Sequence, residues 1–391
     1  MGPARGGRGG ARLPPLRRRV VHHRRAPPRR RGRDCGHRSV RALITSADRP
    51  PLVRALREGS GGNARRKDPP VSVRAVTIAV VPPNPTADDL DALFDALSNW
   101  GRWGDADERG TLNHLTPEHR RRAAALVVDG TAVSLAHDLG VVPSAETPFP
   151  ADHHMVAAGD ARENTGIPGY EASRDYVGTH VHGLGVTHVD ALCHMFVRGT
   201  MYNGRPASEV RSDGARVNTI MTMADGIVGR GVLLDVCAAT GGPLADDAVI
   251  TRAQLEATEQ ALGVEVGPGD VLCIATGRDA RRAEAGGVLD PRRGMAGVHP
   301  DCLPFFAERE IAVLGSDGIS DPMPGLGVPG WAFPVHQIGI VALGLPLIDN
   351  LHLGRLAERC AAAGRYEFLF TVGPLRVPGG TGCPVNPIGV L

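Results

Sequence analysis

The segment His180–Phe196, HVHGLGVTHVDALCHMF, carries four histidines and one aspartate at even-numbered positions: His180, His182, His188, Asp190 and His194. Because alternate side chains of an extended strand share one face, a strand here would line one side with imidazoles and a carboxylate. Such groups need partners when they are buried. Imidazole nitrogen and carboxylate oxygen are ligands for Zn²⁺, Mn²⁺ or Fe²⁺, so the segment predicts a metal site.

The centre of this segment, Thr187–His194, sets the geometry of the expected site. In a strand, His188 and Asp190 lie about 6.6 Å apart along one face, which lets both side chains reach one metal ion. His194 follows four residues after Asp190, where the chain can turn into a helix. We therefore expect His194 to be a further ligand or a base beside a water on the metal.

The composition divides the chain of 391 residues into two unlike regions. Residues 1–70 contain 20 Lys and Arg against 4 Asp and Glu, whereas the whole chain has a net charge of only +2, so the remainder is strongly acidic. Because the front of the chain shows almost no helical or strand periodicity, we predict that residues 1–75 are a basic, disordered extension. A nucleic-acid-binding arm is the less favoured interpretation, and nucleic acid is not an expected partner.

Cysteine usage and hydropathy indicate the cellular compartment of the protein. The seven cysteines include no CxxC pair, which suits reduced thiols in the cytoplasm better than a disulfide framework. No apolar run approaches the roughly 18 residues that a membrane span needs. The longest apolar run, Ile338–Ile348, contains two glycines and a proline. We expect a cytoplasmic protein that does not cross a membrane.

Residues 76–391 mix helical and strand patterns without strict alternation, which predicts a single α/β domain. Helices are expected from Thr86, between Thr116 and Gly130, and at Leu255–Leu262, Pro304–Glu308 and His352–Ala362. Strands are expected at Val133–Leu139, Val177–Val189, Gly231–Asp235, Val271–Thr276, Ile311–Gly315 and Glu367–Val372.

The pattern THxDxxxH at Thr187–His194 resembles the signature of the metal-dependent cyclase-like hydrolases, which include kynurenine formamidases and isatin hydrolases. The resemblance covers roughly residues 100–391 and rests on five further segments: Trp103–Asn113, Gly269–Gly277 with its GDVLxxxTG pattern, Gly315–Asp321, Pro334–His336 and Leu347–Leu351. It implies an α/β fold in which a mixed β-sheet closes into a barrel-like core with helices outside. It also implies a homodimer or higher homo-oligomer.

The resemblance also implies roles for individual residues. His188, Asp190 and His336 match metal ligands, and His194 matches the catalytic acid/base of the formamidases. Asp349 matches a further acidic ligand, although formamidases usually carry glutamate at this position. Asp317 and Asp321 fall in a similar segment, where they could bind substrate or stabilise a turn.

Leu184 departs from the family's pattern, which has histidine four residues before His188. His182 could replace that ligand only through a bulge at Gly183–Gly185, because a straight strand places His182 about 20 Å from His188. We expect one divalent metal ion, Zn²⁺ or Mn²⁺, bound by His188, Asp190, His336 and Asp349. Two ions, with His182 recruited as a ligand, are the alternative.

The resemblance implies a metal-dependent hydrolase of an amide or formamide, such as N-formylkynurenine, or of a small lactone. A metal would activate a water molecule, and His194 would move the proton. Two other classes stay open. One is a non-catalytic metal-binding protein that retained the scaffold, which Leu184 favours, and the other is a lyase or cyclase acting on a polyketide-like acid.

We predict that a truncated chain beginning at Val76 folds, binds metal and turns over substrate like the full chain, because the composition separates residues 1–75 from the acidic remainder. Soluble yield, circular dichroism and metal content check this. Loss of soluble protein on truncation would show instead that residues 1–75 pack against the rest. A salt-sensitive loss of nucleic-acid binding would favour the basic-arm interpretation.

Overall fold

The computed structural model of the chain describes Gly2 and residues 81–160 and 167–391. Contacts divide the chain into two units, Met1–Val71 and Ser72–Leu391. The second unit is described from Val81 onward, with a gap at residues 161–166. The expected extension at residues 1–75 lies outside the described residues except for Gly2, so its disorder and its boundary stay predictions.

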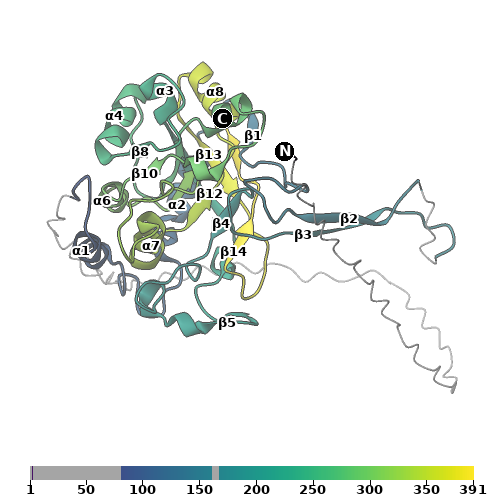
Figure 1. Cartoon of the computed structure of the whole chain (residues 1–391), viewed down its shortest axis with the longest axis horizontal. Coiled ribbons are helices and arrows are strands. Elements are labelled where there is room, and N and C mark those ends of the chain that lie inside the picture. Colours follow the sequence, from purple (N-terminus) through teal and green to yellow (C-terminus); the bar gives the residue numbers. More distant parts are fainter. Residues whose placement is uncertain (1, 3–80, 161–166) are drawn as a thin grey trace, which may run out of the picture. The chain divides into compact units, whose positions relative to one another are not determined.

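Within the described residues, nine strands form one mixed sheet, and their bounds are β1 (Ala132–Ser134), β4 (His188–Asp190), β7 (Ile227–Asp235), β9 (Val271–Ala275), β11 (Val313–Ser316), β12 (Leu347–Asp349), β13 (Glu367–Val372), β14 (Gly382–Pro384) and β15 (Ile388–Val390). The strand order is β1-β15-β13-β7-β9-β11-β12-β4-β14. The four strands from β7 to β12 run parallel, and the flanking pairs are antiparallel. The sheet curls into a half-barrel (Figure 1), which confirms the predicted fold class.

The described residues include eight α-helices, with the bounds α1 (Ala87–Leu97), α2 (Pro117–Ala124), α3 (Val236–Thr240), α4 (Arg252–Leu262), α5 (Arg278–Glu284), α6 (Cys302–Glu308), α7 (Pro334–Ile338) and α8 (Gly354–Ala363). The expected helix starts are confirmed, because the hydroxyls of Thr86 and Thr116 each accept a backbone N–H of the first turn. Helix α2 ends at Ala124, earlier than the predicted end at Gly130. None of the helices in residues 81–160 and 167–391 is long and apolar enough to cross a membrane.

The sheet is buried on both faces. Side chains alternate along β7, so that Val232 and Leu234 pack into one core and Leu233 packs into another. The first core also contains apolar residues of α1, α4, α6 and α7, and α4, α6 and α7 lie together on one side of the strands in Figure 1. The second core contains Leu356 and Cys360 of α8. Burial on both faces explains why β9 is apolar throughout rather than alternating.

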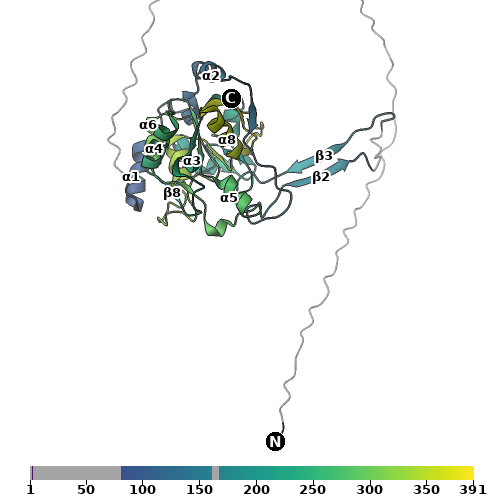
Figure 2. The same cartoon turned by 90° about the horizontal axis from the view of Figure 1, so that it is seen from above.

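Within residues 81–160 and 167–391, three strand pairs lie outside this sheet: β2 (Asp152–Ala157) with β3 (Arg174–Gly178), β5 (Val210–Arg211) with β6 (Gly214–Ala215), and β8 (Val249–Ile250) with β10 (Gly297–Val298). The first pair forms an antiparallel ribbon that extends away from the strands of the main sheet in Figures 1 and 2. Tyr176 and Val177 of the ribbon are exposed.

The expected long strand Val177–Val189 is wrong. Strand β3 ends at Gly178, the chain bends through residues 181–186, and β4 begins only at His188. Gly183 has a φ of +137°, a backbone conformation that residues with a Cβ rarely adopt. The even-numbered face therefore does not extend upstream of His188, and His182 reaches the site by a different route.

Gly231 packs closely against the ring of Phe368, and this contact allows a prediction about stability. A Cβ at Gly231 would stand 2.4 Å from ring atoms of Phe368 on the paired strand β13, and Phe368 is fully buried. Gly231→Ala should therefore lower the free energy of unfolding by about 1–3 kcal/mol, the usual cost of overpacking, as measured by denaturant titration. Gly373→Ala is the control, because a Cβ there would meet nothing within 4 Å. Equal effects of the two substitutions would show that the ring moves aside freely.

Candidate metal centre

Strand pairing brings the two halves of the expected site together. Strand β4 lies between β12 and β14 in the sheet. The pairing of β4 with β12 sets His188 opposite Asp349, and the pairing with β14 sets Asp190 opposite Gly382. His188, Asp190 and Asp349 are all buried. Residues from the two sequence segments that carry the family resemblance therefore occupy neighbouring strands.

Helix α7 supplies His336, and Asp321 fixes its ring. His336 Nδ1 lies 2.7 Å from Asp321 Oδ2, and the two oxygens of Asp321 also accept the backbone N–H groups of Val335 (2.8 Å) and His336 (3.0 Å). His336 Nε2 is thereby directed at Asp349 Oδ2 (3.1 Å) and Asp190 Oδ2 (3.6 Å). Metal-binding histidines commonly donate their other ring N–H to a carboxylate in this way.

His188 and His182 face the same carboxylate from the other side. His188 Nδ1 lies 2.8 Å from the carbonyl oxygen of Val186, and its Nε2 lies 3.5 Å from Asp190 Oδ1. His182 Nδ1 lies 2.9 Å from Asp190 Oδ1, and its Nε2 lies 3.0 Å from Thr381 Oγ1. The ring centroids of His182 and His188 are 5.3 Å apart, so the separation of about 20 Å expected from a straight strand is wrong.

Two overlapping groups of side chains could each hold a metal ion: His182, His188 and Asp190 in one, and Asp190, His336 and Asp349 in the other. Within each group, one potential ligand atom per residue lies within 4.8 Å of the others. Asp190 belongs to both groups, and its Oδ2 is buried without a hydrogen-bond partner among the described residues. Because an orphaned buried carboxylate oxygen is costly, a cation at this position fits the residues present.

The charges in the cluster also favour a cation. Burial tends to raise the pKa of Asp190, but the nearby histidines, above all His194, hold it below its ordinary value. Burial tends to lower the pKa of His336, but Asp349 and Asp321 raise it well above its ordinary value. A proton on His336 therefore offsets the carboxylates around it. Histidine and carboxylate ligands of this kind suit Zn²⁺ or Mn²⁺.

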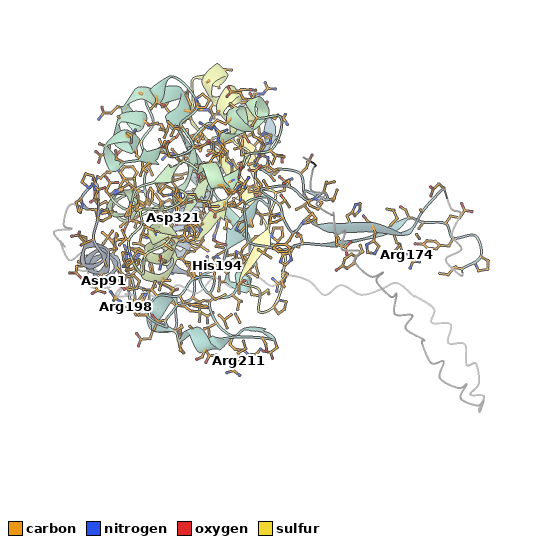
Figure 3. All side chains as sticks on the ribbon, viewed as in Figure 1. Asp91, Arg174, His194, Arg198, Arg211 and Asp321 are labelled. Atoms are coloured by element: carbon orange, nitrogen blue, oxygen red, sulfur yellow. The ribbon has the colours of Figure 1, made fainter. Side chains whose placement is uncertain are left out.

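His194 lies beside this cluster rather than within either group. Its ring stacks on His182 at a centroid distance of 3.7 Å and an angle of 9°, and its Nε2 is 4.0 Å from Asp190 Oδ1. Burial lowers the pKa of His194 to about 4, although Asp190 opposes this shift. The ring is therefore uncharged at neutral pH and can accept a proton. Figure 3 shows His194 and Asp321 in the part of the unit that contains the main sheet, away from Arg174 on the ribbon.

A cavity of about 260 Å³ opens onto the cluster. His182, His188, His194, His336 and Asp349 contribute the polar part of its lining. Leu184, Met195, Ile319 and Phe333 contribute the apolar part. A small molecule in this cavity would lie against His194 and the two potential metal-binding groups together.

Asn350 is a site residue whose role the sequence did not indicate. Its Nδ2 donates to the carbonyl oxygens of Gly183 (2.7 Å) and Val186 (3.1 Å), and Val186 is the residue whose carbonyl orients His188. Arg278 Nη1 donates to Asn350 Oδ1 (3.3 Å), and Arg278 Nη2 donates to the buried Glu146 (2.5 Å). This chain of contacts fixes the bent segment that carries His182 and orients His188 at the start of β4.

Other histidines and aspartates singled out in the sequence take different positions. His180 is exposed and packs against Phe149 with ring centroids 5.4 Å apart, outside both groups. Asp317 accepts the backbone N–H groups of Thr276, Gly277 and Arg278, which is a turn-stabilising arrangement. Asp321, in contrast, orients His336 directly.

Comparison with known proteins shows the family. The family model described as "Putative cyclase" matches residues 117–321. A crystal structure described as a novel cyclase is 33% identical, covers 75% of this chain and 99% of its own, and superposes with a TM-score of 0.68. The chain therefore belongs to the cyclase family.

Two further solved structures match this chain at lower identity. An isatin hydrolase bound to the product analogue thioisatinate is 18% identical, covering 68% of this chain and 94% of its own, with a TM-score of 0.49. Isatin hydrolase A from Labrenzia aggregata, bound to benzyl benzoate, is 19% identical over the same shares of 68% and 94%, with a TM-score of 0.47. Among curated proteins, none matches this chain significantly.

Asn350→Ala should weaken divalent-metal binding by about 10- to 100-fold, the usual scale for residues that orient metal ligands, because the segment from Gly183 to Val186 loses both hydrogen bonds. Competition with a fluorescent chelator, using Zn²⁺ and Mn²⁺, measures this affinity. Asn386→Ala is the matched control, since the side chain of the exposed Asn386 makes only one described contact, in which its Oδ1 accepts a hydrogen bond from the Ser134 hydroxyl (2.6 Å). Wild-type affinity in Asn350→Ala would mean that the segment keeps its conformation unaided.

Proposed function

We propose that this cyclase-family protein is a metal-dependent hydrolase of an amide, a formamide or a small lactone. The observation that carries the proposal is the buried carboxylate of Asp190, which two groups of potential metal ligands share and whose Oδ2 lacks a hydrogen-bond partner among the described residues. A divalent metal bound there would lower the pKa of a water molecule and polarise a substrate carbonyl.

Five residues would hold one or two ions: His182, His188, Asp190, His336 and Asp349. Asp321 and the Val186 carbonyl would keep the rings of His336 and His188 in place, because each accepts a hydrogen bond from Nδ1 and leaves Nε2 facing Asp190. The position of His182 beside Asp190 supports the two-ion alternative over the single ion that the straight-strand interpretation favoured.

His194 would serve as the acid/base. Its uncharged ring can take a proton from the attacking water at Nε2 and return it to the leaving nitrogen or oxygen. Its position on the wall of the 260 Å³ cavity supports this role, since the cavity brings a small substrate against the ring. The cavity size is consistent with a small-molecule substrate.

The rival functions have distinct consequences. A non-catalytic metal-binding protein would bind the ion without turnover, and a lyase or cyclase would yield a product that has not gained the mass of water. Leu184 gave the non-catalytic interpretation its support, but the imidazole of His182 lies 2.9 Å from Asp190 and can supply the missing nitrogen ligand. The homo-oligomeric state, the cytoplasmic location and the arylformamidase-type specificity stay predictions.

Two substitutions separate metal binding from proton transfer. Asp190→Asn should remove most bound metal and all turnover, because the shared ligand loses its charge. His194→Ala should keep its metal and lower kcat by roughly 10²- to 10⁴-fold, the usual contribution of a general acid/base. A panel of formanilides and lactones, followed by mass spectrometry of the products, measures turnover, and elemental analysis measures metal.

The matched control is the pair His153 and Asp175 on the ribbon, which lie 3.1 Å apart outside both metal-binding groups. Asp175→Asn and His153→Ala should leave metal content and turnover at wild-type values. Full turnover after removal of metal with a chelator would contradict a metal-dependent reaction. Unchanged turnover in His194→Ala would contradict the assigned acid/base.

A further inference from the structure

A second hollow of about 300 Å³ adjoins the cavity that contains His194. Both share three lining residues, His182, Gly183 and Leu184. The bent segment that carries His182 is therefore a wall between two spaces. The first space is lined by four potential metal ligands, His182, His188, His336 and Asp349, and the second by His182 alone among them. Leu184 lines both spaces and stands where the family's pattern has histidine, so the shared wall presents an apolar side chain at this position, next to the imidazole of His182.

The lining of the second hollow is apolar over most of its residues, with Thr147, His180 and His182 as polar residues and Glu146 as an acidic one. Ala145, Pro148, Phe149 and Pro291 contribute much of it. Its one acidic residue, Glu146, is buried and accepts hydrogen bonds from the guanidinium groups of Arg278 (2.5 Å) and Arg282 (2.8 Å), which balance its charge. Among the described residues, the linings of the two spaces include neither lysine nor arginine.

This lining limits what a bound molecule can carry. A carboxylate or phosphate on a ligand is commonly recognised by arginine or lysine, and the two spaces offer neither among the described residues. An apolar hollow with few polar groups instead favours aliphatic or aromatic parts of a ligand. Phe149 supports an aromatic part, because this residue is 69% exposed, lines the hollow and packs one aromatic neighbour, His180, against its ring, which leaves surface for a second ring.

We propose that the second hollow is a substrate subsite for an uncharged, apolar or aromatic group, and that Leu184 determines this specificity. The inference rests on the proposed function. The reacting carbonyl would lie beside His194 in the first cavity, and the non-reacting end would pass Leu184 and reach Phe149. Substrates whose non-reacting end carries a charged amino acid group, as in N-formylkynurenine, match this lining poorly.

Hydroxamates test the subsite without turnover, because a hydroxamate binds divalent metals directly. The probes are benzohydroxamate, its meta- and para-phenyl derivatives, and its para-carboxylate, titrated calorimetrically into the zinc-loaded full chain. At least one phenyl derivative should bind roughly 10- to 100-fold more tightly than benzohydroxamate, the scale expected for burying one aromatic ring. The para-carboxylate should bind no more tightly than benzohydroxamate.

Two variants test which residues cause the gain in affinity from the added phenyl ring. Leu184→Asp should bring the ratio of the two dissociation constants, benzohydroxamate over the phenyl derivative, close to one. Phe149→Ser should reduce that ratio severalfold. The control is Leu375→Ser, which replaces an apolar residue of similar exposure, 64%, that lines neither space and should keep the wild-type ratio.

The outcomes distinguish this inference from the proposed function. If benzohydroxamate does not bind the zinc-loaded chain, the proposed metal centre fails and the subsite fails with it. If benzohydroxamate binds but neither phenyl derivative binds more tightly, the subsite alone is overturned. A phenyl gain that survives both Leu184→Asp and Phe149→Ser, or tighter binding of the para-carboxylate, also overturns it.

Discussion

The carboxylate of Asp190 has no exposed surface, and the surrounding structure is arranged to compensate its charge. Three structural elements direct imidazoles at it: strand β4 supplies His188, helix α7 supplies His336, and the bent segment after β3 supplies His182. Removing a carboxylate from water is expensive unless opposite charges or hydrogen bonds replace the water. The sheet order, with β4 between β12 and β14, is what makes this convergence possible.

The sequence predicted the parts of the site that can be inferred from local spacing and from the family resemblance. His188 and Asp190 do share a strand, and the segment with His336 and Asp349 does meet them, as the resemblance implied. The α/β class with a curled mixed sheet is also confirmed. The even numbering of His180 and His182, in contrast, was misleading, because periodicity within a segment does not show where a glycine will bend the chain.

Contacts between distant segments could not be read from the sequence. Asn350 bonds the carbonyl of Gly183, 167 residues away, and Thr381 bonds His182, 199 residues away. Neither residue type is specific for such a role, and no local pattern marks its partner. The order of the strands is equally non-local. In the sequence β14 comes between β13 and β15, but in the sheet β13 and β15 are neighbours and β14 lies at the opposite end. The side chains that orient the potential metal ligands can therefore be identified only from the folded structure, in which the strands are paired.

The sharing of Asp190 between two groups of potential metal ligands has a thermodynamic consequence. An ion bound by one group would withdraw negative charge from the other. The two binding free energies would then be coupled, by the same amount whichever group fills first. The number of ions per chain would then not be a fixed constant of the protein. It would vary with the concentration of free metal, and a titration would show two steps whose spacing combines the coupling with the difference between the two intrinsic affinities.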